Sequence, residues 1–376
     1  MRRLMKLGHV FLSAVAVSAF DMIQMQAWKK EHLTNGTSQI TSWFDGWNIT
    51  LNKHLDDLVL LAEQRQMRAD ALMLEMETSE NPSLHGSVGG SAGDAALTLM
   101  FVGDSTIKMQ AQALGLFAME RVAQDGTPQC SFDPRSVIIH CGSQATGVVG
   151  GDNLMHISFK RVWGTCVDVN AEADFVYFGC GLHLLQLIPA RPLESPAALD
   201  RWLHYEDYLE NATNAYRALN SKRVGYLGEA FMTTHALHEG SMTGTYPRGV
   251  SLYRKRDPTC INTCIRVIKG VRLYSKPKDG GLSPADICTQ GVFNNDGVIS
   301  LNKRASEVMD RLMVPMVPSY KIVEGQGWAT FDAVHYEWLV PLELSHVCLI
   351  ISGLKDKARF QVSPVTTEEG VLGPGV

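Results

Sequence analysis

The sequence Leu97-Thr-Leu-Met-Phe-Val-Gly-Asp-Ser105 joins a mostly apolar run to a Gly-Asp-Ser turn. The apolar run predicts a buried strand over 97–102, and the residues rich in Ala, Leu, Met and Gln over 106–122 predict a helix. Ser105 then stands at a strand-to-helix turn, beside the partial positive charge of a helix N-terminus. Nucleophilic serines are commonly displayed at such turns.

Far downstream, Asp332-Ala-Val-His335 provides the two groups that a nucleophilic serine requires. An imidazole can accept the serine proton, and a carboxylate three residues earlier can orient that imidazole. Ser105, Asp332 and His335 are therefore the candidate catalytic residues. Each also has a simpler interpretation, as a helix-capping serine, a turn-forming aspartate and an ordinary histidine. The preceding strand, the following helix and the downstream acid–base pair together favour catalysis.

The bulk composition is that of a globular protein large enough to bury a full core. The chain has 376 residues, 45% of them hydrophobic, and a formal net charge of −5. Nucleic acid is not an expected partner, because phosphate binding needs clustered Lys and Arg. His235 and His238 are three residues apart, but two ligands do not make a zinc site. We therefore predict no metal and no cofactor.

The order of apolar and helical segments predicts an α/β fold with a central parallel sheet. Further strands are expected at 136–141, 175–178, 224–227 and 347–352. An amphipathic helix is expected over 51–76, either as a stem or self-association helix or, as we favour, docked on the main domain. Another is expected over 301–313.

The N-terminus indicates entry into the secretory pathway. Arg2, Arg3 and Lys6 precede an apolar stretch, and Val17 and Ala19 fit a signal-peptide cleavage site. An uncleaved membrane anchor is the alternative. We divide the chain into residues 1–19, a signal peptide or short anchor; 20–78, a helical or stem region; 79–94, a Gly/Ser-rich linker; 95–354, the main domain; and 355–376, a disordered tail. The protein is expected in the Golgi lumen, at the cell surface or outside the cell.

Cysteines and glycosylation sequons agree with an oxidising compartment. Eight cysteines could form up to four disulfides, although Cys180 and Cys348 lie in apolar runs that also suit buried thiols. Sequons at Asn35, Asn48 and Asn211 predict N-glycosylation.

Two motifs resemble a known superfamily. Phe101-Val-Gly-Asp-Ser-Thr106 resembles the first block of the SGNH or GDSL hydrolases, and Trp328-x3-Asp332-Ala-Val-His-Tyr336 resembles their last block. More narrowly, the pattern is similar to the PC-esterase group, which includes the plant trichome birefringence-like polysaccharide O-acetyltransferases and the proteins that O-acetylate sialic acid and glucuronoxylomannan. Val176–His183, Thr233-Thr-His235 and Leu301-Asn302 also fit that group.

The resemblance covers about residues 96–352 and implies a three-layer α/β/α fold and an O-acyl ester substrate. It assigns Ser105 as nucleophile, His335 as base and Asp332 as the orienting acid. The residues expected to line the site or bind the oxyanion are Gly103, Asp104, Gly179, Gly181 and His183. The family block usually has an Asn at the position that best matches Gly179, so a backbone N–H would have to serve there.

Several functional alternatives remain open from the sequence. The acyl-enzyme could be resolved by water, as in an esterase, or by a sugar hydroxyl, as in an acyltransferase. The expected partner is an O-acylated glycan, on which Trp163, Trp202 or Trp338 could stack, although tryptophans are more often buried. A catalytically impaired protein that binds glycans or acts as a scaffold is the alternative class, because Gly179 has no side-chain donor.

Overall fold

The computed structural model describes residues 38–78, 96–124, 128–133, 138–143, 153–162, 164–166, 172–187, 196–223, 225–238, 262, 265–266, 268–270, 283–290, 294–330, 333–336 and 339–361. The expected signal sequence, the linker 79–94, Asn35 and residues beyond 361 lie outside these ranges. The chain divides into two compact units, Met1–Thr50 and Leu51–Val376. The features discussed below belong to the second unit, although its first helix begins within the first.

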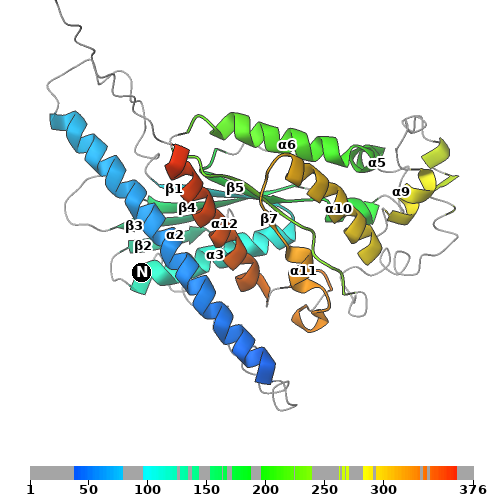
Figure 1. Ribbon diagram of the computed structural model, residues 1–376, viewed down its shortest axis with the longest axis horizontal. Coiled ribbons are helices and arrows are strands. Elements are labelled where there is room, and N and C mark those ends of the chain that lie inside the picture. The colour runs from blue at the N-terminus through cyan, green and yellow to red at the C-terminus, as the bar shows by residue number, and fades with distance from the viewer. Residues whose placement is uncertain are drawn as a thin grey trace, which may run out of the picture. The chain divides into compact units, whose positions relative to one another are not determined.

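A seven-stranded sheet of order β2-β3-β4-β1-β5-β6-β7 forms the centre of this unit (Figure 1). Five neighbouring strands are all parallel, and they are β4 (Asn153–Arg161), β1 (Leu97–Gly103), β5 (Phe175–Gly179), β6 (Gly228–Met232) and β7 (Met316–Val317). At the β4 edge, β3 (Ile138–Ser143) and β2 (Pro128–Asp133) add antiparallel strands. The predicted α/β class with a parallel central sheet is confirmed.

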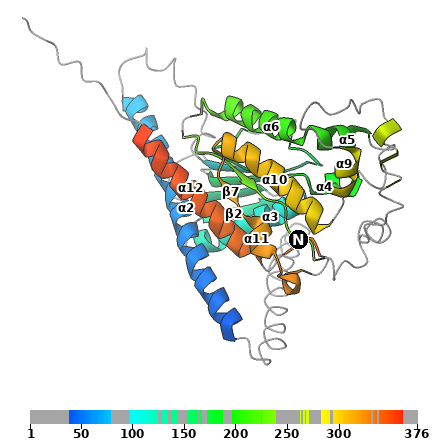
Figure 2. The same ribbon diagram turned by 45° about the vertical axis from the view of Figure 1, so that its right-hand side comes forward.

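Helices cover the sheet on both faces (Figures 1 and 2). Helices α3 (Ser105–Gln124) and α12 (Val340–Gln361) pack against each other on one face, and α6 (Tyr205–Asn220) and α10 (Asn295–Arg311) do so on the other. Shorter helices are α4 (Leu182–Leu187), α5 (Pro196–Leu203), α9 (Pro284–Gln290), α11 (Ser319–Val323) and the 3-10 turn η3 (Gly327–Ala329).

Strand β5 shows why the central strands read as continuous apolar runs. All five of its residues are buried, as expected for a parallel strand covered on both faces. Successive side chains point to opposite faces. Phe178 packs edge-on against Tyr216 of α6, with ring centroids 5.3 Å apart, whereas Tyr177 packs against Phe101 at 5.4 Å.

The long expected helices and several expected strands are confirmed, but two predictions at the C-terminus are wrong. Residues 347–352, expected as a strand, lie within α12, and residues 355–361 of the expected tail continue the same helix. The apolar run misled because Val347, Cys348 and Ile351 are buried at helical spacing, while Leu349 between them is 52% exposed. The expected strand at 224–227 is also wrong, since β6 begins at Gly228.

The cysteine alternatives are resolved at two positions. Cys166, just after β4, is disulfide-bonded to Cys180, just after β5, so Cys180 is not a free thiol. Cys348 is a buried free thiol, and burial raises its pKa to about 12. Cys288 is also disulfide-bonded. None of the described helices has the length and apolarity needed to cross a bilayer.

Helix α2 (Ser38–Thr78) docks on the sheet domain from Leu51 onward. Its buried residues include Leu51, Leu55, Leu58, Leu61 and Ala62, and it lies alongside α12 in both ribbon views (Figures 1 and 2). Arg65 fixes its position by donating to Gly225 O and to Asp174 Oδ1, each at 3.1 Å. Since Asp174 is fully buried just before β5, this part of α2 belongs to the domain core.

We predict that Arg65→Met lowers the free energy of unfolding by about 2 to 4 kcal/mol, because the buried Asp174 carboxylate loses a charged partner. Urea unfolding of the variant measures the change. Arg68→Met, three residues along the same helix and exposed, is the control and is expected to stay within about 0.5 kcal/mol of the wild type. Equal stability of the two variants would show that α2 is not anchored through Arg65.

Candidate active site

Ser105 lies at the position where sheets of this order usually bind ligands. Numbered by their order in the chain, the five parallel strands lie across the sheet in the order 2-1-3-4-5, which is a doubly wound arrangement. The direction of winding reverses between β1 and β5, and ligands bind outside the carboxyl ends of the strands at that point. Ser105 follows β1 after one intervening residue and begins α3. The predicted strand-to-helix turn is confirmed.

Two glycines let the chain turn at this edge. Gly103 and Gly179 are register partners at the ends of β1 and β5. A Cβ added to Gly103 would lie 2.5 Å from both Gly179 O and Ile107 Cγ1, so only glycine fits beneath the first turn of α3. A Cβ on Gly179 would lie 2.9 Å from Met232 Cβ and would point into the core. Any contribution of Gly179 to the site therefore comes from its backbone.

Asp104 caps the helix that carries the serine. Its Oδ1 accepts hydrogen bonds from Thr106 N at 2.9 Å and from Thr106 Oγ1 at 2.5 Å. This contact satisfies an amide that has no acceptor within the helix. Asp104 is 5% exposed, so it holds the first turn of α3 rather than contacting solvent. The expected site-lining residue is thus a helix N-cap.

The central contact of the site joins Ser105 and His335. Ser105 Oγ lies 2.6 Å from His335 Nε2, although the two residues are 230 positions apart in the chain. Both residues are half-buried, which leaves the pair open to solvent. A hydroxyl that donates to an imidazole nitrogen is the arrangement of an activated nucleophile and its base. Asp332, the predicted orienting acid, lies outside the described residues.

The backbone before His335 is held against the segment that follows β6. Ala333 adopts a φ of 74°, in a region that a non-glycine residue seldom enters. Its carbonyl oxygen accepts from His238 N at 3.0 Å. The next carbonyl, Val334 O, lies 3.3 Å from His235 Nδ1. Two contacts therefore fix the turn that presents His335.

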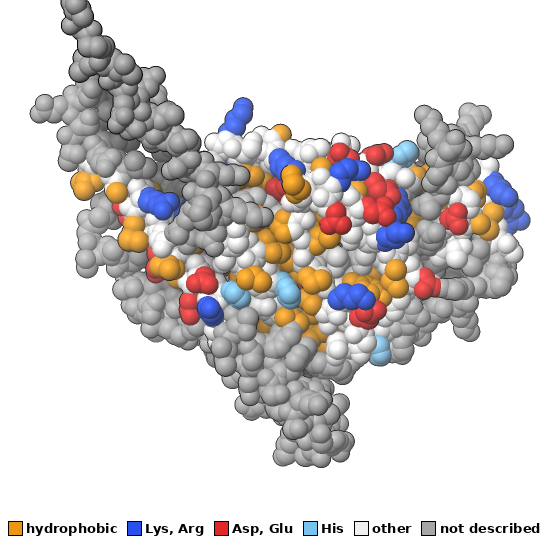
Figure 3. All heavy atoms as spheres, in the orientation of Figure 1, with side chains coloured by type: hydrophobic (Ala, Val, Ile, Leu, Met, Phe, Trp, Pro, Cys, Tyr) orange, Lys and Arg blue, Asp and Glu red, His pale blue; other side chains and the backbone are white. Residues whose placement is uncertain are grey.

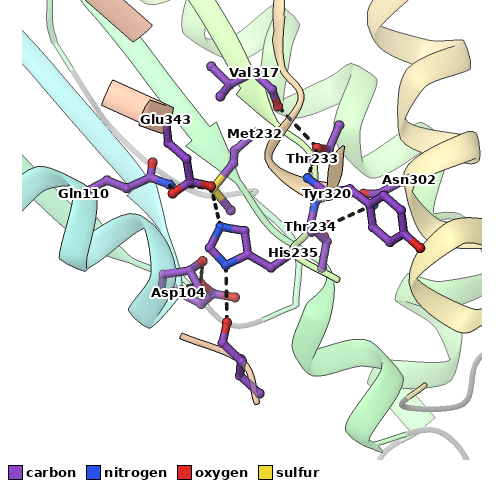
Figure 4. A network of polar contacts seen from close by, with 12 residues as sticks. Asp104, Gln110, Met232, Thr233, Thr234, His235, Asn302, Val317, Tyr320 and Glu343 are labelled. Carbon is purple, nitrogen blue, oxygen red and sulfur yellow. Dashed lines mark hydrogen bonds and ion pairs between the residues drawn. The ribbon is translucent and has the colours of Figure 1, made fainter. Parts of the chain in front are cut away.

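Two asparagines of α10 clamp that same segment. Asn302 accepts from Thr234 N at 2.7 Å and donates to Thr234 O at 2.9 Å (Figure 4). Asn295, two helical turns before Asn302 on the same face of α10, repeats the pattern by accepting from Leu237 N at 2.7 Å and donating to Leu237 O at 2.8 Å. Each side-chain amide pairs with the N–H and the C=O of one residue, as a neighbouring antiparallel strand would. We call residues 233–238 the anchor segment.

The other face of the anchor segment is held by β7 and α11. Thr233 N donates to Val317 O at 3.1 Å, which extends the pairing of β6 with β7. Thr233 Oγ1 accepts from Tyr320 N at 3.0 Å (Figure 4). The segment is consequently bonded on both sides before it contacts the turn that carries His335.

A buried histidine completes the connection. His235 Nε2 lies 2.6 Å from Glu343 Oε1, and Gln110 Nε2 donates to Glu343 Oε2 at 2.6 Å (Figure 4). None of these three side chains is exposed. Burial alone would lower the pKa of His235, but the contacts with Glu343, Val334 O and Asp104 together outweigh burial and raise the pKa above its ordinary value.

The sequence did not predict this part of the site. Glu343 was hidden because the residues following it were assigned to a strand, and Gln110 has no motif to mark it. His235 was noted as half of a possible metal pair and as part of a stretch that resembles the PC-esterase group, but neither observation assigned it a partner. In the structure both of its ring nitrogens already have partners, and no cluster of three potential metal ligands occurs among the described residues.

The remaining expected site residues are placed as follows. Gly181 precedes α4 with a φ of +127°, and a Cβ there would meet Leu301 Cδ2 at 2.8 Å. His183 is half-buried in the first turn of α4. Trp202 is fully buried beneath Arg304, whose guanidinium lies 4.7 Å from its ring, so it cannot stack on a sugar. Trp163 and Trp338 lie outside the described residues.

Of the three sequon asparagines, the structure describes the side chain of one, Asn211. Asn211 is exposed on α6. Asn48 lies in α2, in the part whose side chains are not described.

Acidic and basic side chains are interspersed over the described part of the face drawn in Figure 3. That face shows no single-sign field for a highly charged polymer.

Comparisons with known proteins add no further assignment. No family model matches the chain, and no curated protein matches it significantly. The chemistry of the site is therefore argued from its geometry. A serine in contact with an imidazole, at the carboxyl edge of a parallel sheet and at a helix N-terminus, is equipped for nucleophilic attack on an electrophilic carbon.

We predict that Gly103→Ala lowers the free energy of unfolding by about 1 to 3 kcal/mol, because the added methyl group overlaps a backbone carbonyl that cannot move away. Thermal and urea unfolding measure the effect. Gly353→Ala is the matched control, since a Cβ at Gly353 in α12 meets nothing within 4 Å. That control is expected to gain up to about 1 kcal/mol from helix propensity.

The raised pKa of His235 predicts a pH-dependent contribution to stability. A group whose pKa is higher in the folded state stabilises that state fully below its unfolded pKa and loses this effect as the pH rises through the folded pKa. Wild type should therefore exceed Glu343→Gln in unfolding free energy by more at about pH 6 than at about pH 9. Urea unfolding at both pH values tests this. A gap that stays constant would mean that His235 is neutral throughout.

Proposed function

We propose that the chain is a serine O-acyl esterase or O-acyltransferase, with Ser105 as nucleophile and His335 as general base. The 2.6 Å separation of Ser105 Oγ and His335 Nε2 carries the proposal. Ser105 Oγ attacks the acyl carbonyl while His335 Nε2 takes its proton. The protonated imidazole then donates that proton to the departing alkoxide, leaving an acyl-enzyme and a free alcohol.

The second half of the reaction repeats the first with a new nucleophile. Water, or a sugar hydroxyl, gives its proton to His335 as it attacks the acyl-enzyme carbonyl. The bond from the acyl carbon to Ser105 Oγ then breaks, and the imidazolium returns that proton to Ser105 Oγ, which regenerates both residues. Asp332 is proposed to orient the imidazole. Which acceptor is used decides between esterase and acyltransferase, and the described geometry is equally suited to both.

The oxyanion is proposed to bind to backbone amides. The N–H of Ser105 begins α3, where amides have no intrahelical acceptor and the helix dipole favours negative charge. The Thr106 amide is already bonded to Asp104. The loop over Gly179–Gly181 ends β5 beside β1 and is the proposed source of a second donor. Because a side chain at 179 would point into the core, a backbone donor replaces the family's asparagine.

The narrower assignment rests on the sequence motifs. We propose an SGNH-like enzyme of the PC-esterase type that acts on O-acylated glycans in the secretory pathway. The Cys166–Cys180 disulfide supports an oxidising compartment, where such bonds persist. The neutral acyl ester, rather than a charged group, is the proposed recognition element at the serine.

Covalent labelling by a fluorophosphonate probe tests the proposed nucleophile. We expect wild type to be labelled, Ser105→Ala to be unlabelled, and His335→Ala to react at least about a hundredfold more slowly, because the serine loses its base. The exposed Ser221 lies outside the site, and Ser221→Ala is the control expected to label normally. Labelling that persists in Ser105→Ala would contradict the mechanism.

Acetate release from an O-acetylated polysaccharide, with and without a deacetylated acceptor, separates hydrolysis from transfer. Acetate transferred to the acceptor indicates an acyltransferase, and free acetate an esterase. Retained glycan binding by a wild type that neither labels nor releases acetate would favour the impaired, glycan-binding alternative.

A further inference from the structure

We propose that His235 and Glu343 form a buried positioning pair that holds the backbone of the Ala333–His335 turn, and thereby aims the His335 imidazole at Ser105. The inference rests on the proposed function, because it concerns the residue assigned there as base. Neither His235 nor Glu343 has exposed surface, so neither can touch a substrate. They are positioning residues, not catalytic ones.

The first support is the path of contacts between the two members of the catalytic pair. Gln110 lies on α3, five residues after Ser105, and donates to Glu343 of α12. The other oxygen of Glu343 faces His235 Nε2, and His235 Nδ1 faces Val334 O, one residue before His335. The helix that carries Ser105 and the turn that carries His335 are thus both linked to one buried carboxylate, whose contacts with Gln110 and His235 are drawn in Figure 4.

The second support is the proton that this arrangement requires. A carbonyl oxygen can only accept, so Nδ1 of His235 must carry a hydrogen to bond Val334 O. If Nε2 were unprotonated, its lone pair would face the Glu343 carboxylate. Both contacts are favourable when the ring is an imidazolium, and then both nitrogens donate. Glu343 therefore keeps the Nδ1–H directed at the turn.

The surroundings of His235 agree with a charged ring. Glu343 of α12 faces one side, Asp104 lies close enough to raise the pKa further, and the ring of Tyr336 packs edge-on at 5.5 Å between centroids. Among the described residues, no cationic side chain pairs with His235, and the charged groups that shift its pKa are the carboxylates of Glu343 and Asp104. The position of the ring is also fixed through its backbone, because His235 belongs to the anchor segment, whose peptide groups are hydrogen-bonded to Asn302 and Asn295 of α10.

A positioning role predicts which changes matter. Glu343→Gln keeps the hydrogen-bond pattern, because Gln110 can donate to the new amide oxygen and the new NH2 can donate to Nε2 of a neutral ring. Nδ1 then still donates to Val334 O. His235→Phe combined with Glu343→Leu keeps the packing and leaves no buried charge unpaired, but it removes the donor to Val334 O. The two variants separate the charge from the hydrogen bond that holds the turn.

The full-length protein and a fluorophosphonate probe test this, with the maximal labelling rate constant and the probe dissociation constant measured separately. The labelling rate constant of the double variant is expected to fall about tenfold or more, because even a small misplacement of the base slows proton transfer. The dissociation constant of the probe is expected to stay within about twofold of the wild-type value. Glu343→Gln is expected to keep at least about a third of the wild-type rate constant.

A second ion pair, in which the carboxylate is buried and the guanidinium is part-exposed, supplies the control. Arg217 and Glu229 are in contact on α6 and β6, away from the Ala333–His335 turn, with Glu229 5% exposed. Arg217→Met with Glu229→Leu should lower the melting temperature by a similar amount and leave the labelling rate constant unchanged. A control that slows labelling as much as the His235 double variant would overturn the proposal, as would wild-type labelling by that double variant.

A readout without catalysis distinguishes this inference from the proposed function. In protein labelled with 15N-histidine, the ring resonances of His335 should shift in the His235→Phe, Glu343→Leu variant and stay in place in the Arg217, Glu229 control. Unchanged His335 resonances would overturn the positioning role even if the wild type never reacts with the probe. If the His335 resonances shift in the double variant but the wild type is not labelled by the probe, the proposed function alone is overturned.

If the double variant does not fold, Gln110→Met tests the same path from the α3 end. The loss of its donor to Glu343 should slow labelling by about threefold, because His235 keeps its own contact with the turn. Labelling at the full wild-type rate, with the His335 resonances also unmoved, would again overturn the proposal.

Discussion

Hydrogen bonding of one extended segment, residues 233–238, determines whether this site exists. The segment continues β6 beyond the sheet, where its peptide groups have no full strand on either side. Asn302 and Asn295 of α10 pair with its backbone on one side, and Thr233 contacts Val317 and Tyr320 on the other. Such pairing satisfies buried peptide groups that would otherwise destabilise the fold. Only a segment held in this way can support the turn before His335.

The serine is positioned by a different constraint, the close approach of two strands. Gly103 and Gly179 let β1, β5 and the first turn of α3 meet without side chains between them. Asp104 then caps the helix, and Ser105 is half-buried at its first position. Ser105, the proposed nucleophile, is therefore positioned by local backbone geometry, whereas His335, its proposed base, is positioned by long-range contacts. The proposed His235–Glu343 pair is where these two systems meet, because Gln110 belongs to the serine's helix and Val334 to the histidine's turn.

Elements with strong local signals could be predicted from the sequence. The apolar run before Ser105 and the helix-forming residues after it gave β1 and α3, and the amphipathic pattern over 301–313 gave most of α10. The segment 347–352 failed because five apolar residues in a row suit both a buried strand and a helix packed on one side. Strand β4 was missed because polar and apolar residues alternate along it, as in Met155-His-Ile-Ser-Phe159, so it lacks the continuous apolar run by which β1 and β5 were predicted.

By itself, the sequence determined an α/β protein with Ser105 at a strand-to-helix turn and named His335 as its partner. The first conclusion follows from burial periodicity and turn residues that act locally, and the second from the short Asp332-x-x-His335 motif. Only the tertiary structure decided that Ser105 Oγ and His335 Nε2 meet at 2.6 Å, that α2 docks through Arg65, and that Glu343 faces His235. Those contacts join residues more than a hundred positions apart, and packing of helices on a twisted sheet, not local sequence, selects them.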